Sequence, residues 1–467
     1  MRAAPFLSGY DRFRMGATLI RGARVIDPER NRDSTGDVLI GDGLIRGVSN
    51  RPGELAANGA EVVEGEGRIL APGLFDPHVH LREPGAEQKE TIASGAAAAI
   101  AGGFTSVCCM PNTRPALDVP SLIDFVHLKA ERAGMARVFC AGAATVNRAG
   151  EELAPIAAMA RAGAVAFTDD GDCIASAAMM GRVLQICACA GRAFMQHAQE
   201  PSLTSGGVMN AGVVAARLGL GGWPAVAEEV IVERDIRLNR AIGCRYHVQH
   251  VSSGTTVDIL RQARAAGQPV SGEASPHHLL LTDEACAGYN TQAKVNPPLR
   301  TAADMAALVK GVADGSISVL ATDHAPHTAA EKARDFNGAP FGMIGLECAL
   351  ALYARALVDS GAIGWDRLVA LLTIEPARLC GLVERGVGTM RIGAPADLTL
   401  IDPQRKWTIR SAEFASLSRN CPFDGWEVRA RATDVWVGGR RLLRDCCAES
   451  NPPRRTSDQS TRRTQAA

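Results

Sequence analysis

The chain has 467 residues, 46% of them hydrophobic, so it can bury a large core and does not have the composition of a disordered protein. Its 50 Lys and Arg residues balance 50 Asp and Glu residues, which leaves no global field to hold nucleic acid or an anionic membrane. The 13 cysteines are scattered and include no C-x-x-C pair, which favours a reduced, cytoplasmic compartment over a disulfide framework.

The two ends of the chain differ from the rest. Residues 1–16 contain no apolar core of the kind that a signal peptide needs, and we expect a flexible extension there. Residues 448–467 are polar and rich in Pro, Arg, Ser and Thr, which predicts a disordered tail. The longest apolar run, SGAAAAIAGGFTSVCCM, consists mostly of Ala, Gly and other small residues and is too weakly hydrophobic to cross a membrane.

Two separate segments of the chain are rich in short β-prone runs. Residues 17–72 contain short β-prone runs broken by DP, GD and DG, which predicts hairpins of a small antiparallel sheet. The same texture returns in residues 388–447, for example in ADLTLID and ATDVWVGG. Because these two distant segments have the same pattern, we predict a single small β-domain, of sandwich type, built from both ends of the chain.

Residues 73–387 change to an alternation of short apolar strands and Ala-rich helices. Examples are the pairs ETIASGAAAAIAGG with TSVCCMPN, MMGRVLQICACAGR with AFMQHAQE, and AALVKGVADGS with ISVLATDHAPH. This rhythm is typical of a parallel sheet, and the number of repeats and the length favour a TIM-like (β/α)8 barrel. An open doubly wound sheet is the second possibility, but no G-x-G-x-x-G opens a helix after a strand.

Polar side chains follow the strands at their carboxyl ends, in DPHVH, PNT, TDD, QH, QH and TDH. In a βα barrel these ends form the catalytic mouth, so residues far apart in sequence would meet there. Six of them are candidate metal ligands: His78, His80, Asp170, His197, His250 and Asp323. Imidazole nitrogens and carboxylate oxygens are zinc ligands, and six exceed the need of one tetrahedral ion. They suit two ions bridged by a carboxylate, although one-metal and two-metal forms are both chemically workable.

A single histidine at a strand end is often structural, so the direction in which each of these side chains points matters. Strand alternation places His78, His80 and Arg82 on one face, with Arg82 as an anion-binding residue. His247 is turned away from the site by the same alternation. His327 follows in the loop over the mouth, where it could bind a substrate carboxylate. We expect supporting roles for the other histidines near the mouth: His277, His278 and His324.

The chain resembles the class I dihydroorotases of the amidohydrolase superfamily over about residues 17–445. The resemblance lies in DPHVHLREPG, GGFTSVCCMPNT, AFTDDGD, HVSS, ASPHHLLLT, KVNPPLR, LATDHAPH and APFGMIGLE. It implies that His78 and His80 bind the more buried Zn²⁺ ion and that His197 and His250 bind a second. The family usually shows an acid where Gln199 stands, which puts the surroundings of His197 in question.

The resemblance also assigns the carboxylates. Asp170 would bridge the two ions, whereas hydantoinases and allantoinases use a carboxylated lysine, which AVAFTDDGD lacks. Asp323 would bind the first ion and act as the catalytic proton shuttle. Asp169 would have a supporting role.

Six further residues resemble the family's substrate-binding set. Arg82, Asn112 and His327 would hold the substrate α-carboxylate, a task that suits the bidentate guanidinium fork. Asn296 would contact the pyrimidine ring, and Phe341 and Gly342 would offer backbone groups to the ring amide.

The activity implied is the reversible, zinc-dependent cyclisation of N-carbamoyl-L-aspartate to L-dihydroorotate in pyrimidine biosynthesis, without an organic cofactor. Three alternatives stay open: another cyclic amidase such as an allantoinase or hydantoinase, a non-catalytic partner of aspartate transcarbamoylase, and a purely structural metal-binding barrel. A homodimer and an association with aspartate transcarbamoylase are possible, and no nucleic-acid or membrane partner is expected.

Overall fold

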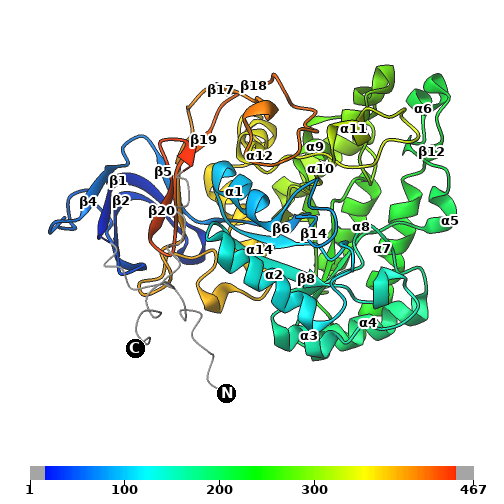
Figure 1. The fold of residues 1–467 in the computed structure, drawn as a ribbon, viewed down its shortest axis with the longest axis horizontal. Coiled ribbons are helices and arrows are strands. Elements are labelled where there is room, and N and C mark those ends of the chain that lie inside the picture. The colour runs from blue at the N-terminus through cyan, green and yellow to red at the C-terminus, as the bar shows by residue number, and fades with distance from the viewer. Residues whose placement is uncertain (1–15, 449–467) are drawn as a thin grey trace, which may run out of the picture.

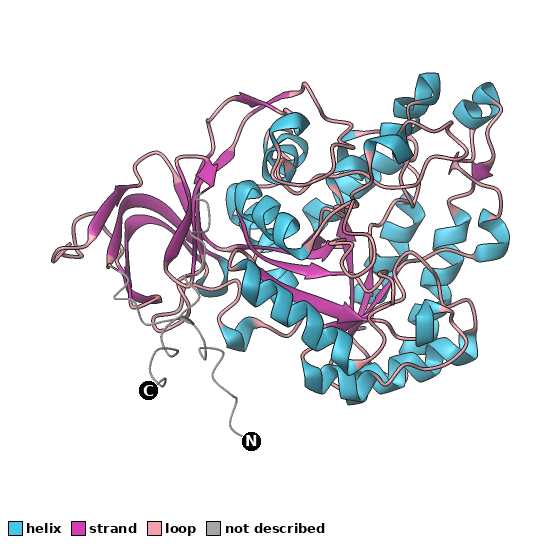
Figure 2. Cartoon of the chain, in the orientation of Figure 1, coloured by secondary structure: helices cyan, strands magenta, loops and turns pink. Residues whose placement is uncertain are grey.

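Two segments far apart in the chain build one nine-stranded sheet, seen at the left of the computed structural model, which describes residues 16–448 (Figures 1 and 2). The strands on its main path, in spatial order, are β21 (Cys447–Ala448), β20 (Arg440–Arg444), β19 (Arg431–Val437), β16 (Leu398–Asp402), β5 (Ile69–Pro72), β1 (Thr18–Asp27), β2 (Arg32–Gly41) and β3 (Leu44–Val48). Antiparallel pairing of β5 with β16 joins the two segments.

The small sheet differs from the predicted set of hairpins in one respect. β4 (Glu61–Glu64) and β5 both run parallel to β1, because the loop after β3 brings the chain back beside β1 in the same direction. The sheet also curls, since the Ile45 N–H donates to the Ala394 carbonyl at 3.0 Å. Apolar side chains from both segments, including Ile20, Val38 and Trp436, fill the enclosed core.

Eight parallel strands form the barrel: β6 (Leu74–Val79), β7 (Phe104–Cys109), β8 (Arg137–Gly142), β9 (Ala166–Phe167), β10 (Ala193–Gln196), β13 (Tyr246–Val248), β14 (Val270–Ala274) and β15 (Val319–Leu320). The chain just beyond β15 returns to β6, where the His80 N–H donates to the His324 carbonyl at 2.8 Å and Val79 bridges His324 in parallel. This contact closes the barrel at the carboxyl end of β6, next to the candidate ligands His78 and His80.

Helices cover the barrel (Figure 2). Those between successive strands include α1 (Ile92–Gly102), α2 (Pro120–Ala133), α3 (Ile156–Ala162), α4 (Ala177–Cys189), α7 (Val226–Asn239), α8 (Gly254–Ala265) and α10 (Ala302–Asp314), and α13 (Trp365–Leu372) and α14 (Ile374–Leu379) follow the last strand. Local sequence fixes their ends. α1 begins with a capping box between Thr91 and Ser94 and stops at Gly103, whose φ of 95° suits glycine. A Cβ at Gly103 would lie 2.7 Å from the Ala432 Cβ of β19, so this glycine also permits close packing of the small sheet.

The predicted fold class, a (β/α)8 barrel with a small β-domain from both chain ends, is confirmed. The domain boundaries at 72/73 and 387/388 stay predictions. The predicted extension and tail lie outside the described residues, apart from Gly16 and Ala448. Within residues 16–448, none of the helices has the length and apolar character needed to cross a bilayer.

Candidate metal centre and substrate site

Four imidazoles surround one carboxylate at the carboxyl end of the barrel. The Asp170 carboxylate lies 3.4 Å from His78 Nε2, 3.6 Å from His80 Nε2, 3.5 Å from His197 Nδ1 and 3.7 Å from His250 Nε2. These residues form two groups that share Asp170, and within each group all ligand atoms lie within 4.8 Å of one another. The arrangement fits two metal ions with Asp170 between them.

The imidazole of His78 is held in a form suited to bind a metal. Its Nδ1 lies 2.6 Å from Glu273 Oε1, so Nδ1–H donates to this carboxylate and Nε2 keeps its lone pair. Nε2 is buried without a hydrogen-bond partner among the described residues and points toward Asp170. A bound cation would satisfy this orphaned nitrogen.

Glu273, at the end of β14, is a residue to which sequence reasoning gave no role. Its carboxylate is fully buried and also lies 2.9 Å from His247 Nε2, while the His250 N–H donates to it at 3.1 Å. His247 therefore lies outside the ligand cluster, as expected, but supports His78 through Glu273. The signal that could have identified Glu273 is its place among the polar strand ends, in SGEAS.

Asp323 and His80 approach each other closely. Asn112 Oδ1 lies 2.9 Å from His80 Nδ1 and accepts its proton, so His80 Nε2 presents a lone pair to Asp323 Oδ1, 2.9 Å away. Two electron-rich atoms at this distance need a proton or a metal ion between them. Asn112, predicted to bind substrate, thus also orients a candidate ligand.

The backbone is strained at three of the predicted site residues. Arg82, His250 and Asp323 have φ of 58°, 32° and 49°, a region that side chains other than glycine seldom adopt. Such strain is maintained where the surrounding structure specifies a geometry, and it clusters at functional sites. At Arg82, it also shows that strand alternation has ended, because β6 stops at Val79.

Burial and charge act in opposite directions on the carboxylates. Burial alone would raise the pKa of Asp170 and of Asp323. When no metal is bound, protons and positive charge on the facing imidazoles outweigh burial and hold the pKa of both carboxylates below its ordinary value. Both carboxylates are therefore ionised at neutral pH and available as ligands, in a cluster whose six members are no more than 5% exposed.

His197 is connected to a predicted substrate residue through Gln199. The Gln199 Oε1 atom lies 3.0 Å from His197 Nε2 and accepts from Asn296 Nδ2 at 3.2 Å. The amide oxygen thereby fixes the His197 tautomer, leaving Nδ1 to face Asp170. Glutamine accepts this hydrogen bond as a carboxylate would, but without the negative charge.

Arg82 and His327 lie together beside the ligand cluster. Their closest nitrogens, Arg82 Nη2 and His327 Nε2, are 3.4 Å apart, and Lys89 Nζ lies 3.5 Å from His327 Nδ1. Burial and these cations lower the pKa of His327 to about 2, so its imidazole is neutral. Arg82, Lys89 and Asn112 line a cavity of about 540 Å³ that opens from the barrel mouth. Four basic and two acidic side chains line the cavity, and the acidic ones pair with Lys89 and Arg148, at 2.8 and 2.7 Å.

The predicted substrate loop approaches the same place. The Phe341 carbonyl accepts from His327 Nε2 at 2.7 Å. Gly342 has φ of 127°, and a Cβ there would lie 2.8 Å from the Ala325 Cβ and 3.1 Å from His327 Nε2. Only glycine fits at this position without displacing its neighbours.

Other residues support the site from behind. Asp169 accepts from the Ala144 and Thr145 N–H groups, at 2.8 and 3.0 Å, instead of facing the metal cluster. Asp76, which sequence reasoning also left without a role, accepts from the N–H groups of His78 and Thr322 and so ties β6 to the end of β15.

The remaining histidines near the mouth lie outside the ligand cluster. His278 Nε2 lies 3.1 Å from the Pro297 carbonyl, and His324 Nδ1 lies 3.4 Å from the N–H groups of Gly345 and Leu346. Burial lowers the pKa of His277 to about 4, which keeps its imidazole neutral.

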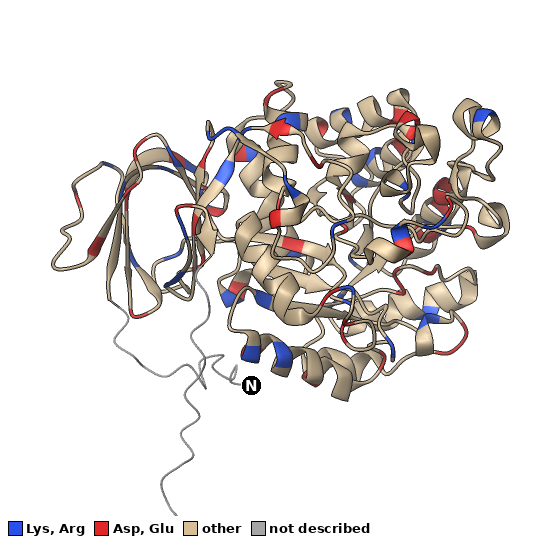
Figure 3. Cartoon of the chain, turned by 45° about the horizontal axis from the view of Figure 1, so that its top comes forward, with Lys and Arg blue, Asp and Glu red and all other residues tan. Residues whose placement is uncertain are grey.

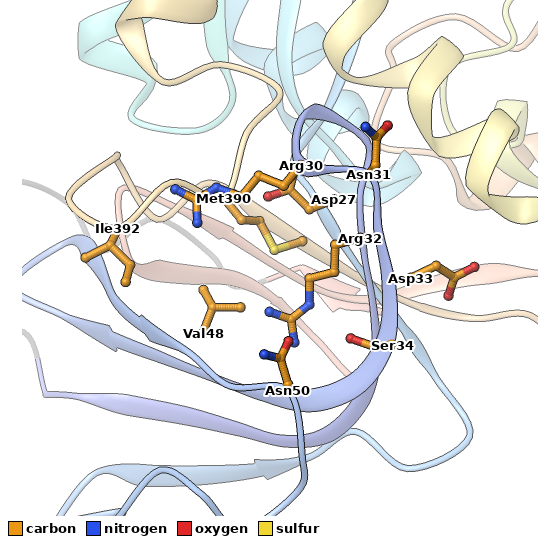
Figure 4. Close-up of a pocket in the computed structure, with 10 residues that line it drawn as sticks. All are labelled: Asp27, Arg30, Asn31, Arg32, Asp33, Ser34, Val48, Asn50, Met390 and Ile392. Carbon is orange, nitrogen blue, oxygen red and sulfur yellow. The ribbon is translucent and has the colours of Figure 1, made fainter.

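A second cavity, of about 500 Å³, lies in the small sheet and contains none of the predicted site residues (Figure 4). Arg32, Asn50 and Met390 are among the side chains that surround it. Basic and acidic residues are scattered over the ribbon of both the sheet and the barrel (Figure 3). The concentration of buried ionisable groups at the barrel mouth is therefore the clearest chemical feature of the molecule.

Comparisons with known proteins identify the family of the chain. A family model described as "Dihydro-orotase-like" matches residues 67–256. A dihydroorotase of Pelotomaculum thermopropionicum is 45% identical and covers 91% of this chain and 98% of its own; one of Streptomyces coelicolor is 43% identical, covering 92% and 99%. Among solved structures, the L-hydantoinase of Arthrobacter aurescens has the same fold, with a TM-score of 0.82, 24% identity, and coverage of 93% and 97%. The chain belongs to the dihydroorotase family.

Proposed function

We propose that this protein is a dihydroorotase that interconverts N-carbamoyl-L-aspartate and L-dihydroorotate. The observation that carries the proposal is the juxtaposition of a buried His and Asp cluster, centred on Asp170, with the pocket that the Arg82 guanidinium lines beside it. The cluster suits amide hydrolysis, and the pocket suits a substrate with a carboxylate next to the ring. Relatives more than 40% identical over nearly their whole length carry the same name.

The cluster would hold two Zn²⁺ ions, with His78, His80 and Asp323 on one, His197 and His250 on the other, and Asp170 shared. Nitrogen and oxygen ligands of this kind suit zinc, and the bare Nε2 of His78 supports the assignment. Bound zinc supplies Lewis acidity, which activates both an amide carbonyl and water. The chain's contribution is to fix the ligands, chiefly through Glu273, Asn112 and Gln199.

Asp323 would carry the proton. In the hydrolytic direction, water adds to the ring amide carbonyl carbon, and its proton passes to the Asp323 carboxylate. The carbon–nitrogen bond then breaks, and Asp323 delivers the proton to the departing ureido nitrogen. In the synthetic direction, Asp323 removes that proton as nitrogen adds to the carboxyl carbon, and it then delivers the proton to the hydroxyl group, which leaves as water. The lowered pKa of Asp323 keeps its carboxylate ionised.

Substrate orientation would come from residues around the mouth. Arg82, Asn112 and His327 would hold the α-carboxylate, with the guanidinium supplying charge and a bidentate fork. Asn296 would contact the ring, and the backbone of Phe341 and Gly342 would pair with the ring amide. Burial lowers the pKa of Arg82 to about 10, which still leaves it cationic at neutral pH.

A substrate panel tests this proposal. Metal-loaded protein is incubated with L-dihydroorotate, hydantoin and allantoin, and ring opening is followed by loss of absorbance. We expect L-dihydroorotate to be strongly preferred, because the other two ring systems lack a carboxylate for Arg82. Preference for hydantoin or allantoin would favour another cyclic amidase. Full metal occupancy with no turnover would favour a non-catalytic partner of aspartate transcarbamoylase.

Assembly and location belong to the same proposal. A homodimer, an association with aspartate transcarbamoylase and a cytoplasmic location would suit a biosynthetic enzyme that acts on small molecules. Light scattering of the purified protein, alone and mixed with aspartate transcarbamoylase, measures the first two.

A further inference from the structure

Two buried lysines lie behind the loop of residues 336–342, far from any role in metal binding. Lys294 and Lys332 are each 2% exposed, and among the described residues neither forms an ion pair. Burial lowers the pKa of Lys294 to about 8 and that of Lys332 to about 7. Lysine is seldom buried without a carboxylate, so the position of both needs an explanation.

Backbone carbonyls take the place of the missing carboxylates. Lys294 Nζ donates to the carbonyls of Phe336, Asn337 and Ala339 at 2.7, 3.0 and 2.7 Å. Lys332 Nζ donates to the carbonyls of Pro340, Gly342 and Lys294 at 3.1, 3.0 and 3.4 Å. An ammonium group has three N–H donors, so each lysine is fully matched by carbonyls.

The two lysines thereby define the path of the loop. Five of the six carbonyls come from residues 336–342, and the sixth belongs to Lys294, whose carbonyl also accepts from the Gly342 N–H at 2.9 Å. The Lys294 ammonium lies 4.5 Å from the centre of the Phe341 ring, a cation–π contact. The loop is therefore held by the amino groups of two buried lysines, in addition to the apolar packing of Phe336.

The loop in turn fixes His327. The Phe341 carbonyl accepts from His327 Nε2, which leaves Nδ1 as the acceptor facing Lys89. A shift of the Phe341 carbonyl would release the His327 ring from this orientation. The Gly342 carbonyl accepts from Lys332, and a Cβ at Gly342 would lie 3.1 Å from Nε2 of the same ring, so the loop backbone passes close to His327. A continuous set of contacts runs from the lysines through the loop to the carboxylate pocket.

We propose that Lys294 and Lys332 are positioning residues for substrate binding, which hold the 336–342 loop so that His327 and the Phe341–Gly342 backbone face the substrate. The identity of that substrate rests on the proposed function. The lysines do not contact the reacting atoms. Their loss should therefore weaken substrate binding more than it slows the chemical step.

Single Lys332→Met and Lys294→Met variants test the proposal, because methionine keeps most of the apolar stem and removes the donors. Lys310→Met, at an exposed position on α10, is the matched control. Hydrogen exchange of a peptide covering residues 336–342 should accelerate in both test variants and not in the control. The KM for L-dihydroorotate should rise between about 10-fold and 100-fold, with kcat changed less than about 3-fold and metal content unchanged.

Unchanged exchange of the loop, or a lower melting temperature with an unchanged KM, would overturn the proposal, since the lysines would then be merely structural. If Lys332→Met does not fold, Lys332→Gln replaces it, and one unpaired carbonyl should still raise KM. Failure of the proposed function is recognisable separately, because the wild-type protein would then not turn over dihydroorotate. In that case, faster hydrogen exchange of residues 336–342 in the lysine variants still supports their role in holding the loop, and unchanged exchange contradicts it.

Discussion

Glu273→Gln isolates the contribution of the carboxylate behind the metal cluster. Glutamine has almost the same shape and can keep its oxygen on His78 Nδ1 and the His250 N–H, while its amide faces His247. What is lost is the negative charge that receives the His78 proton at 2.6 Å. Hydrogen bonds to charged groups contribute about 1 kcal/mol more than neutral ones. Loss of an outer partner of a metal-binding histidine typically costs about 10-fold to 100-fold in affinity, or about 1.4–2.7 kcal/mol.

The assay is competition for Zn²⁺ between the protein and a chromophoric chelator of known affinity. We expect the metal affinity of Glu273→Gln to fall by this amount, with near-native circular dichroism. Asp37→Asn is the matched control, since Asp37 is also a fully buried carboxylate but accepts from the Gly22 and Gly53 N–H groups in the small sheet. Wild-type affinity in Glu273→Gln, or an equal loss in both variants, would refute the idea that Glu273 acts through His78.

Further substitutions test other parts of the site. Asp323→Asn should lower kcat by about 10²-fold to 10⁴-fold while metal analysis shows nearly unchanged occupancy; an active variant would exclude Asp323 as the proton shuttle. Gln199→Ala should weaken zinc binding about 10-fold or more in the chelator assay, because His197 loses its partner; unchanged affinity would contradict this. Gly342→Ala should raise KM and lower the melting temperature, since the added Cβ meets Ala325; a silent substitution would show that the loop is free to move. Burial raises the pKa of Asp235 to about 6. The protonated carboxyl group therefore adds to the free energy of unfolding below the ordinary pKa of aspartate, and this stabilisation is lost as pH rises through 6. Urea unfolding of metal-free protein should therefore show Asp235→Asn gaining up to about 3 kcal/mol relative to wild type between pH 4 and pH 7, and a constant difference would contradict this.

The strand-end rule explains why much of the site could be predicted from sequence. In a parallel barrel, every strand delivers its last polar residue to the same mouth, so His78, Asp170 and His250 could be placed together without knowing any helix packing. The rule does not extend past the strand. Arg82 reaches the site through a left-handed backbone, which alternation cannot predict.

What sequence reasoning missed has a common physical origin. Glu273 acts by contact with His78, 195 residues away, and such a pair is visible only in three dimensions. Lys294 and Lys332 were missed because lysine normally predicts an exposed side chain, and the carbonyls that satisfy them come from an irregular loop. The parallel pairing of β4 with β1 was missed because local β-propensity does not reveal which edge a returning strand will join.

The central claim is tested most directly by titrating metal-free protein with Zn²⁺ and measuring hydrolysis of L-dihydroorotate at each addition. The account predicts no turnover in the metal-free protein, a rise with added zinc, and saturation at two equivalents per chain, since Asp170 lies between two sets of ligands. Saturation at one equivalent would contradict the bridging role of Asp170. Absence of turnover at full occupancy would contradict the assignment of the protein as a dihydroorotase.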